Sequence, residues 1–182
     1  MKTWEKDFLR LALADHAFRE ADALAQHIIE SKFPSESHLL SAAVAGVAVC
    51  YCRPFMSATG LGPLPPSMQE FAGAKNEQEL RGAHLMIFEA RHKLAAHFDR
   101  AHGEELHKAG VLPLSPSEVR INFQQHGFAV STNAAYLNPE KLPAARDLFA
   151  FQMARVTSQL GVFGVQMLKK YRKLGEVVFK VP

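Results

Sequence analysis

The chain has 182 residues, enough for one domain that buries a core without disulfide or metal support. Hydrophobic residues make up 48% and charged residues 21%, a composition that excludes extended disorder. The formal net charge of +3 permits a nucleic-acid partner without requiring one, because strong binders usually carry a dense basic patch.

The cysteines and the apolar runs indicate the cellular compartment of the protein. Cys50 and Cys52 follow a small-residue apolar run, which predicts reduced, buried or half-buried thiols in a cytoplasmic protein. The N-terminal residues carry interspersed charges and lack the apolar core of a signal peptide. The longest apolar run, 39–50, is too short to cross a bilayer, so we expect no membrane association.

Three helices are predicted in the first hundred residues. Apolar residues recur at three- and four-residue steps from 4 to about 31, and Pro34 ends this helix. The next helix, about 36–52, is apolar nearly all round, as expected of a central helix surrounded by others. Ser67 with Glu70 predicts one short capped turn, and Asn76 with Glu79 predicts a capping box that opens a third helix ending near residue 99.

The pattern changes after an uncertain stretch at 101–117, which fits a frayed turn and a loop equally well. Apolar residues alternate with polar ones over 118–132, which predicts a β-hairpin, and 176–181 could add a third strand. A long helix is predicted between them, from residue 139 or 143 to 174. The fold class is therefore mainly α, a four-to-five-helix bundle in a single domain, 1–182. Its small antiparallel β-appendage includes a hairpin insertion at about 117–133.

The nine histidines do not form a metal-binding pattern. Helical metal ligands favour i, i+4 spacing because it places both rings on one side of the helix. His92, His97, His102 and His107 are five residues apart, so each step turns about 140° around an ideal helix. The sequence also lacks the motifs of serine hydrolases, P-loop enzymes and dinucleotide-binding enzymes. We therefore expect no metal and no cofactor.

Arg91 and His97 are the remaining candidates for catalytic residues. An arginine stays cationic and grips phosphate with its planar guanidinium, and a histidine titrates near neutrality and can act as general acid or base. RNA cleavage without metal needs both kinds of group. The two residues are six positions apart, about 120° around and about 9 Å along an ideal helix, so helical register alone does not bring them together.

The segment 91–97, RHKLAAH, resembles the signature of the HEPN superfamily, helical domains of prokaryotic toxin and defence systems and of some RNases. That signature is an arginine followed by Asn, Asp or His, and then a histidine a few residues later. Arg91, His92 and His97 match it position by position, and the following residues, AAHFD, resemble the A-H-x-D ending of HEPN-like families. YCRPF at 51–55 also resembles an element of such small bacterial proteins. The hairpin and the long last helix are not part of the minimal HEPN bundle.

The resemblance implies a HEPN-like protein that cleaves RNA without metal, or binds it, in a stress, toxin–antitoxin or phage-defence system. Arg91 and His97 would be catalytic, and His92 would orient them. The substrate contacts implied are Arg53, Lys93 and Asp99. The resemblance also implies a homodimer whose two motifs line one cleft, and a protein partner of the antitoxin kind.

A second interpretation is a non-catalytic helical module that binds a protein partner or a small ligand through a groove between helices. In that case Glu89 and Lys93 would form an i, i+4 salt bridge, and His97 would be a packed residue near a helix end. Burial of Arg91 and His97 against carboxylates or carbonyls would favour this second interpretation.

Overall fold

Four long helices make up most of the chain that the structure describes. The computed structural model describes residues 3–31, 33, 38–56, 61–96, 118–124, 127–133 and 137–171. The long helices are α1 (Thr3–Ser31), α2 (His38–Cys52), α3 (Glu77–Ala96) and α5 (Leu142–Tyr171). Three short 3-10 helices accompany them: η1 (Arg53–Phe55), η3 (Pro66–Gln69) and η4 (Pro139–Lys141). The prediction of a mainly helical bundle is confirmed.

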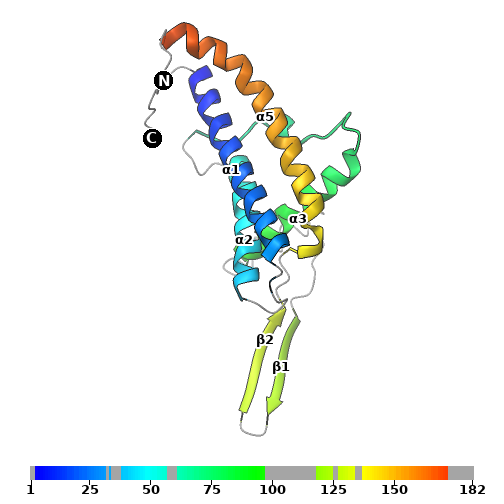
Figure 1. Ribbon diagram of the computed structural model, residues 1–182. Coiled ribbons are helices and arrows are strands. Elements are labelled where there is room, and N and C mark those ends of the chain that lie inside the picture. The colour runs from blue at the N-terminus through cyan, green and yellow to red at the C-terminus, as the bar shows by residue number, and fades with distance from the viewer. Residues whose placement is uncertain are drawn as a thin grey trace.

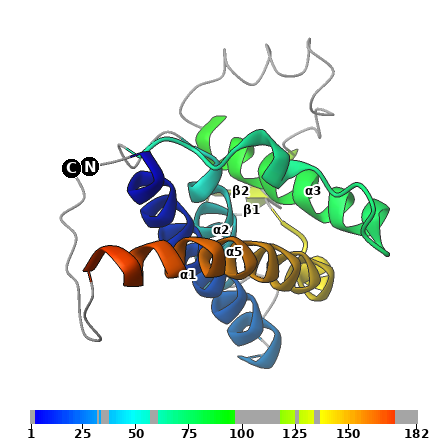
Figure 2. The same ribbon diagram turned by 90° about the horizontal axis from the view of Figure 1, so that it is seen from above.

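The bundle is built on α1 and α5, which run antiparallel and share the most extensive helix contact (Figure 1). α2 packs on α1, and α3 packs on both α2 and α5. Figure 2, seen from above, shows α5 crossing α1, with α3 to one side of α5. This arrangement holds α3, the helix that carries the sequence motif, between α2 and α5.

Aromatic rings fill the centre of the bundle. Tyr51 of α2 is fully buried, and its ring centroid lies 5.5 Å from that of Phe18 on α1 and 5.2 Å from that of Phe149 on α5. The buried apolar residues of α3 recur at three- and four-residue steps: Leu80, Ala83, Ile87 and Ala90. This spacing turns one side of α3 toward the core, so the residues just after Ala90 emerge at its edge.

The expectation that other helices surround α2 holds only in part. Leu39 and Val49 on α2 are 69% and 52% exposed although the helix is apolar nearly all round. The reason is the pairing of the helices, because α5 packs mainly on α1 and α3 and leaves one side of α2 uncovered.

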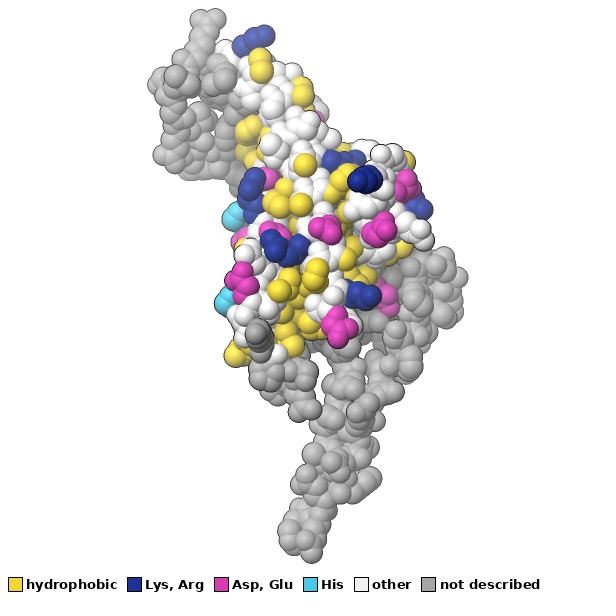
Figure 3. Space-filling view, turned by 45° about the vertical axis from the view of Figure 1, so that its right-hand side comes forward, with side chains coloured by type: hydrophobic (Ala, Val, Ile, Leu, Met, Phe, Trp, Pro, Cys, Tyr) yellow, Lys and Arg dark blue, Asp and Glu magenta, His cyan; other side chains and the backbone are white. Residues whose placement is uncertain are grey.

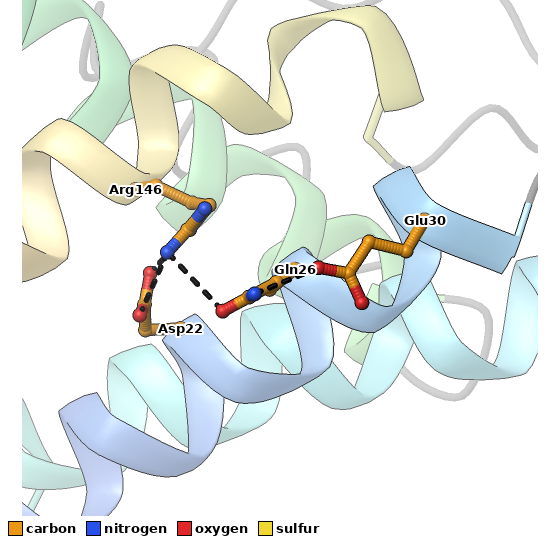
Figure 4. A network of polar contacts seen from close by, with 4 residues as sticks. All are labelled: Asp22, Gln26, Glu30 and Arg146. Carbon is orange, nitrogen blue, oxygen red and sulfur yellow. Dashed lines mark hydrogen bonds and ion pairs between the residues drawn. The ribbon is translucent and has the colours of Figure 1, made fainter.

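Polar contacts fasten α1 to α5 at both ends. Arg146 of α5 donates to both carboxylate oxygens of Asp22, at 2.7 and 3.3 Å, and also to Gln26, whose amide donates to Glu30 (Figure 4). Near the other end, Lys170 donates to the buried carboxylate of Glu5. These contacts fix the direction and the register of α5 on α1.

Two strands lie between α3 and α5 in the chain. β1 (Glu118–Gln124) and β2 (Gly127–Asn133) pair antiparallel, with Ile121 opposite Val130. Figure 1 shows the pair extending from one end of the bundle. The third strand predicted at 176–181 lies outside the described residues.

Candidate functional site

Arg91 and His92 lie in the last described turns of α3, directly after the buried residue Ala90. Both side chains are half-buried at the edge of the core. The helix therefore presents a permanent cation and a titratable ring next to each other, where solvent reaches them. A negatively charged ligand could meet both groups without entering the core.

Arg91 differs from most arginines of the described helices in having no acceptor. Within the described chain, no carboxylate or carbonyl lies within hydrogen-bond or ion-pair distance of its guanidinium, and Arg81 on the exposed side of the same helix is alike in this. The other arginines are held by carboxylates or main-chain carbonyls: Arg10 by Leu61, Arg19 by Asp15, Arg53 by Glu20, Arg146 by Asp22, and Arg155 by Ser67, Met68 and Glu70. Arg91 is thus a half-buried cation without a protein counter-ion in this part of the chain.

The electrostatic effect of Arg91 reaches Cys52 at the end of α2. Burial raises the pKa of the Cys52 thiol to about 12, and the charge of Arg91 opposes that rise. The Cys52 thiol also lies 4.0 Å from the carbonyl oxygen of Ile87, one turn before Arg91. Arg91 therefore sits over the junction between α3 and the end of α2.

His92 lies against an aromatic neighbour one turn earlier on the same helix. The centroid of its ring is 6.4 Å from that of Phe88, and the two planes are inclined by 50°. Phe88 in turn contacts the rings of Tyr51 and Phe55 at 6.3 and 5.6 Å. His92 is thus positioned by the aromatic core of the bundle.

Arg53, which directly follows α2, is held by an ion pair with α1. Its guanidinium donates to Glu20 of α1 at 2.7 Å and lies 3.7 Å from the sulfur of Cys50. Its side chain therefore extends toward α1, whereas Arg91 lies on α3. A phosphate at Arg53 would have to compete with the Glu20 carboxylate.

The remaining predicted site residues are His97, Asp99 and Lys93. His97 and Asp99 lie outside the described residues, and so does the side chain of Lys93. The separation of Arg91 from His97 remains a prediction from helix geometry.

The sequence interpretation missed a buried histidine. His84 of α3 is buried, its Nδ1 lies 2.7 Å from the hydroxyl oxygen of Tyr51, and rings of Phe55, Phe71 and Phe88 surround it at centroid distances of 4.5 to 5.5 Å. Burial lowers the His84 pKa from 6.5 to about 4, and burial raises the Tyr51 pKa well above 10. Both groups are therefore neutral at pH 7, and the tautomer of the imidazole decides which of them donates in this hydrogen bond. A substrate has no access to this pair, so its role is structural.

A buried amide lies beside the same tyrosine. Gln152 of α5 is fully buried, and its Nε2 donates to the carbonyl of Met68 at 2.9 Å. Its Oε1 has no hydrogen-bond partner among the described residues. Its amide also lies close enough to the Tyr51 hydroxyl to lower the pKa of Tyr51 slightly, against the larger effect of burial. Tyr51 thus links polar groups of α3 and α5 across the core.

The cysteines match the sequence interpretation. Cys50 is half-buried, Cys52 is buried, and both are free thiols. Burial raises the pKa of Cys50, as it does that of Cys52. Raised thiol pKa values do not suit a cysteine nucleophile at neutral pH.

Two further features can be stated for the described residues. They contain no group of three or more His, Cys, Asp or Glu side chains arranged to hold a metal ion. None of their helices combines the length and the apolar character needed to cross a membrane. Comparison of the chain with protein-family models, with curated proteins and with solved structures found no match.

Proposed function

We propose that the end of α3 binds RNA phosphate groups and, together with His97, cleaves RNA without a metal ion, as the HEPN-like motif implies. The HEPN-like character of the bundle and the three-stranded appendage that 176–181 would complete are parts of this proposal. So are a cytoplasmic setting, a homodimer and an antitoxin-like partner.

One observation carries the proposal. Arg91 is a half-buried guanidinium for which the described chain supplies no anion, while most other arginines of the helices are already held. A guanidinium binds phosphate through parallel N–H donors, and partial burial strengthens that attraction relative to a fully solvated site. The phosphodiester of RNA is an anion whose oxygens match the parallel donors of a guanidinium.

The proposed reaction divides the work between two side chains. The imidazole of His97 takes the proton of a 2′-hydroxyl, and the 2′-oxygen attacks the adjacent phosphorus. The bond to the 5′-oxygen breaks, that oxygen takes a proton from water, and a 2′,3′-cyclic phosphate remains, while the protonated His97 returns its proton to water. The Arg91 guanidinium offsets the negative charge that develops on the phosphoryl oxygens.

The test compares variants of one helix in the presence of EDTA. We expect the purified chain to cleave single-stranded RNA, His97→Ala to lower the rate by about 100-fold or more, and Arg91→Ala to weaken RNA binding by about tenfold. Arg81→Ala is the matched control, because Arg81 also has no acceptor but lies about 15 Å away along α3 and about 80° around it. Cleavage that survives His97→Ala, or equal losses for Arg81→Ala and Arg91→Ala, would contradict the proposal.

A second function, a non-catalytic interaction module, is favoured by a separate observation. Val162 and Val165 on the outer side of α5 are large apolar side chains that are 66% and 55% exposed. A chain that binds no RNA but associates through α5 would favour this function over the nuclease.

A further inference from the structure

The outer side of α5 carries an apolar surface beyond the bundle core. Val162 and Val165 are its large exposed residues, and Ala150, Ala154, Ser158 and Gly161 are exposed small residues of the same helix. At about 100° per residue all of these positions fall on one side of the helix. Figure 3 shows apolar side chains along the projecting arm that α5 forms.

A shallow hollow lies on this side, one to two turns before the valines. Phe151, Ala154, Arg155, Ser158 and Gln159 line it. Arg155 stands over the Phe151 ring, 5.4 Å from its centroid, and forms one wall while it donates to carbonyls of η3. The outer side of α5 thus has protruding apolar side chains in its C-terminal half and the hollow in its N-terminal half.

Opposite charges stand at the two ends of the same side. Asp147 and Lys169 are both exposed, and neither forms an ion pair within the described chain. They are about 33 Å apart along the helix, and their angular positions differ by about 40°. The surface therefore has an acidic end, an apolar middle and a basic end.

We propose that two copies of this chain associate through this side, with their α5 helices antiparallel across a two-fold axis near Ser158. In this register Asp147 of each copy faces Lys169 of the other. The same register places Val162 opposite Ala154 and Val165 opposite Phe151. Both valines of one copy therefore meet the hollow of the other.

The two end charges favour a second copy of this chain as the binding partner, and they favour an antiparallel orientation of its α5. A parallel pair would bring Lys169 next to Lys169 and Asp147 next to Asp147, which is repulsive. The antiparallel pair forms two ion pairs at its ends and matches protruding groups to hollows without any further adjustment. A two-fold contact of this kind must be self-complementary, and this one side of α5 supplies both halves. The absence of a side chain at Gly161, with open space around it, lets the two backbones approach closely.

The first test is the oligomeric state across a concentration range by sedimentation equilibrium. We expect a dimer with a Kd on the order of micromolar, as for small interfaces. The variant Val162→Asp should raise this Kd by at least about tenfold. Val49→Asp is the control, because Val49 is similarly exposed but lies on α2, so its dimer should be unchanged. A monomer at all concentrations, or a dimer that survives Val162→Asp, would overturn the proposal.

The second test fixes direction and register. Asp147→Lys and Lys169→Asp should each weaken the dimer, and the double variant should restore it, because each ion pair is re-formed with its charges exchanged. Ser158→Cys should give an intermolecular disulfide under mild oxidation, whereas a cysteine at Thr157 or Gln166 should do so far less. Weaker association of the double variant than of both singles, or equal cross-linking at all three positions, would rule this arrangement out. None of these outcomes depends on RNA binding.

Discussion

At the scale of single residues, the most constrained group is the imidazole of His84. It is buried among four aromatic rings and shares a hydrogen bond with Tyr51, so the neutral imidazole is the form that fits. Protonation would place a charge among apolar groups. The folded state therefore resists protonation of this residue.

This resistance predicts an acid-sensitive fold. The pKa of His84 is about 4 in the folded chain and near 6.5 when unfolded, so the unfolded state binds more protons below pH 6.5. Stability is fully present above pH 6.5 and is lost as the pH falls toward 4, by about 2 kcal/mol at pH 5. Urea unfolding of the wild type and of His84→Gln from pH 7.5 to 5 should show a smaller pH-dependent loss in the variant. Parallel curves for the two proteins would show that His84 does not control this sensitivity.

The residue scale also shows what the sequence could and could not predict. Arg91 and His92 could be placed on the third helix beside its apolar stripe, because they directly follow Ala90 of that stripe. His84 could not be recognised as buried in a polar pair, although it lies on the stripe between Leu80 and Ile87. Its partner Tyr51 comes from another helix, and no local pattern gives that contact. The pairing of Arg53 with Glu20 was missed for the same reason.

At the scale of elements, Arg155 fixes η3 to α5. Its guanidinium donates to the carbonyls of Ser67, Met68 and Glu70 at 2.7 to 3.1 Å, which gives acceptors of this turn a charged donor. Gln152 donates to the same Met68 carbonyl from within the core. The segment before α3 is therefore anchored by side chains of α5, not by regular backbone pairing with it.

We predict that Arg155→Ala loosens this segment. Loss of three charge-assisted hydrogen bonds at a partly exposed site should lower the free energy of unfolding by about 1–2 kcal/mol. Amide exchange should rise selectively over residues 66–71. Arg146→Ala is the matched control, because Arg146 also lies on α5 but pairs with Asp22 of α1, so its loss should leave amide exchange over residues 66–71 unchanged. Equal losses in the two variants, with no local change in exchange, would contradict the anchoring role.

The elements themselves were largely predictable, and their partners were not. Three- and four-residue apolar spacing located α1, α3 and α5, and a continuous apolar run located α2. The predicted start of each helix lies within three residues of the observed one. The short turn after 65 was predicted with Ser67 as its cap, but η3 starts at Pro66, and the residue before it, Pro65, provides no side-chain cap. Pro66 at the first position of the turn has no N–H that would need a cap, and Arg155 serves the carbonyls of the turn instead. Which helix packs on which depends on contacts far apart in sequence, so the expectation that other helices surround α2 held only in part.

At the scale of the whole molecule, the described surface separates two kinds of chemistry. The end of α3 offers cationic groups to an anion, and the outer side of α5 offers apolar groups between charged ends. The mild net charge of +3 means that no general basic field supplies RNA affinity. Binding of RNA would then rest on a few local phosphate contacts, of which Arg91 is the best defined.

This distribution predicts a weak and locally controlled salt dependence of RNA binding. Each phosphate contact on a single strand adds about 0.7 to the slope of the logarithm of the affinity against the logarithm of salt concentration. A few contacts give a slope of about −1 to −3, and Arg91→Ala should reduce its magnitude by about 0.7, because one contact is lost. Fluorescence anisotropy of a labelled single-stranded RNA at several salt concentrations measures this slope, with Arg81→Ala as the control. An unchanged slope in Arg91→Ala would show that its guanidinium does not meet a phosphate. A steep slope in every variant would place the binding surface outside the end of α3.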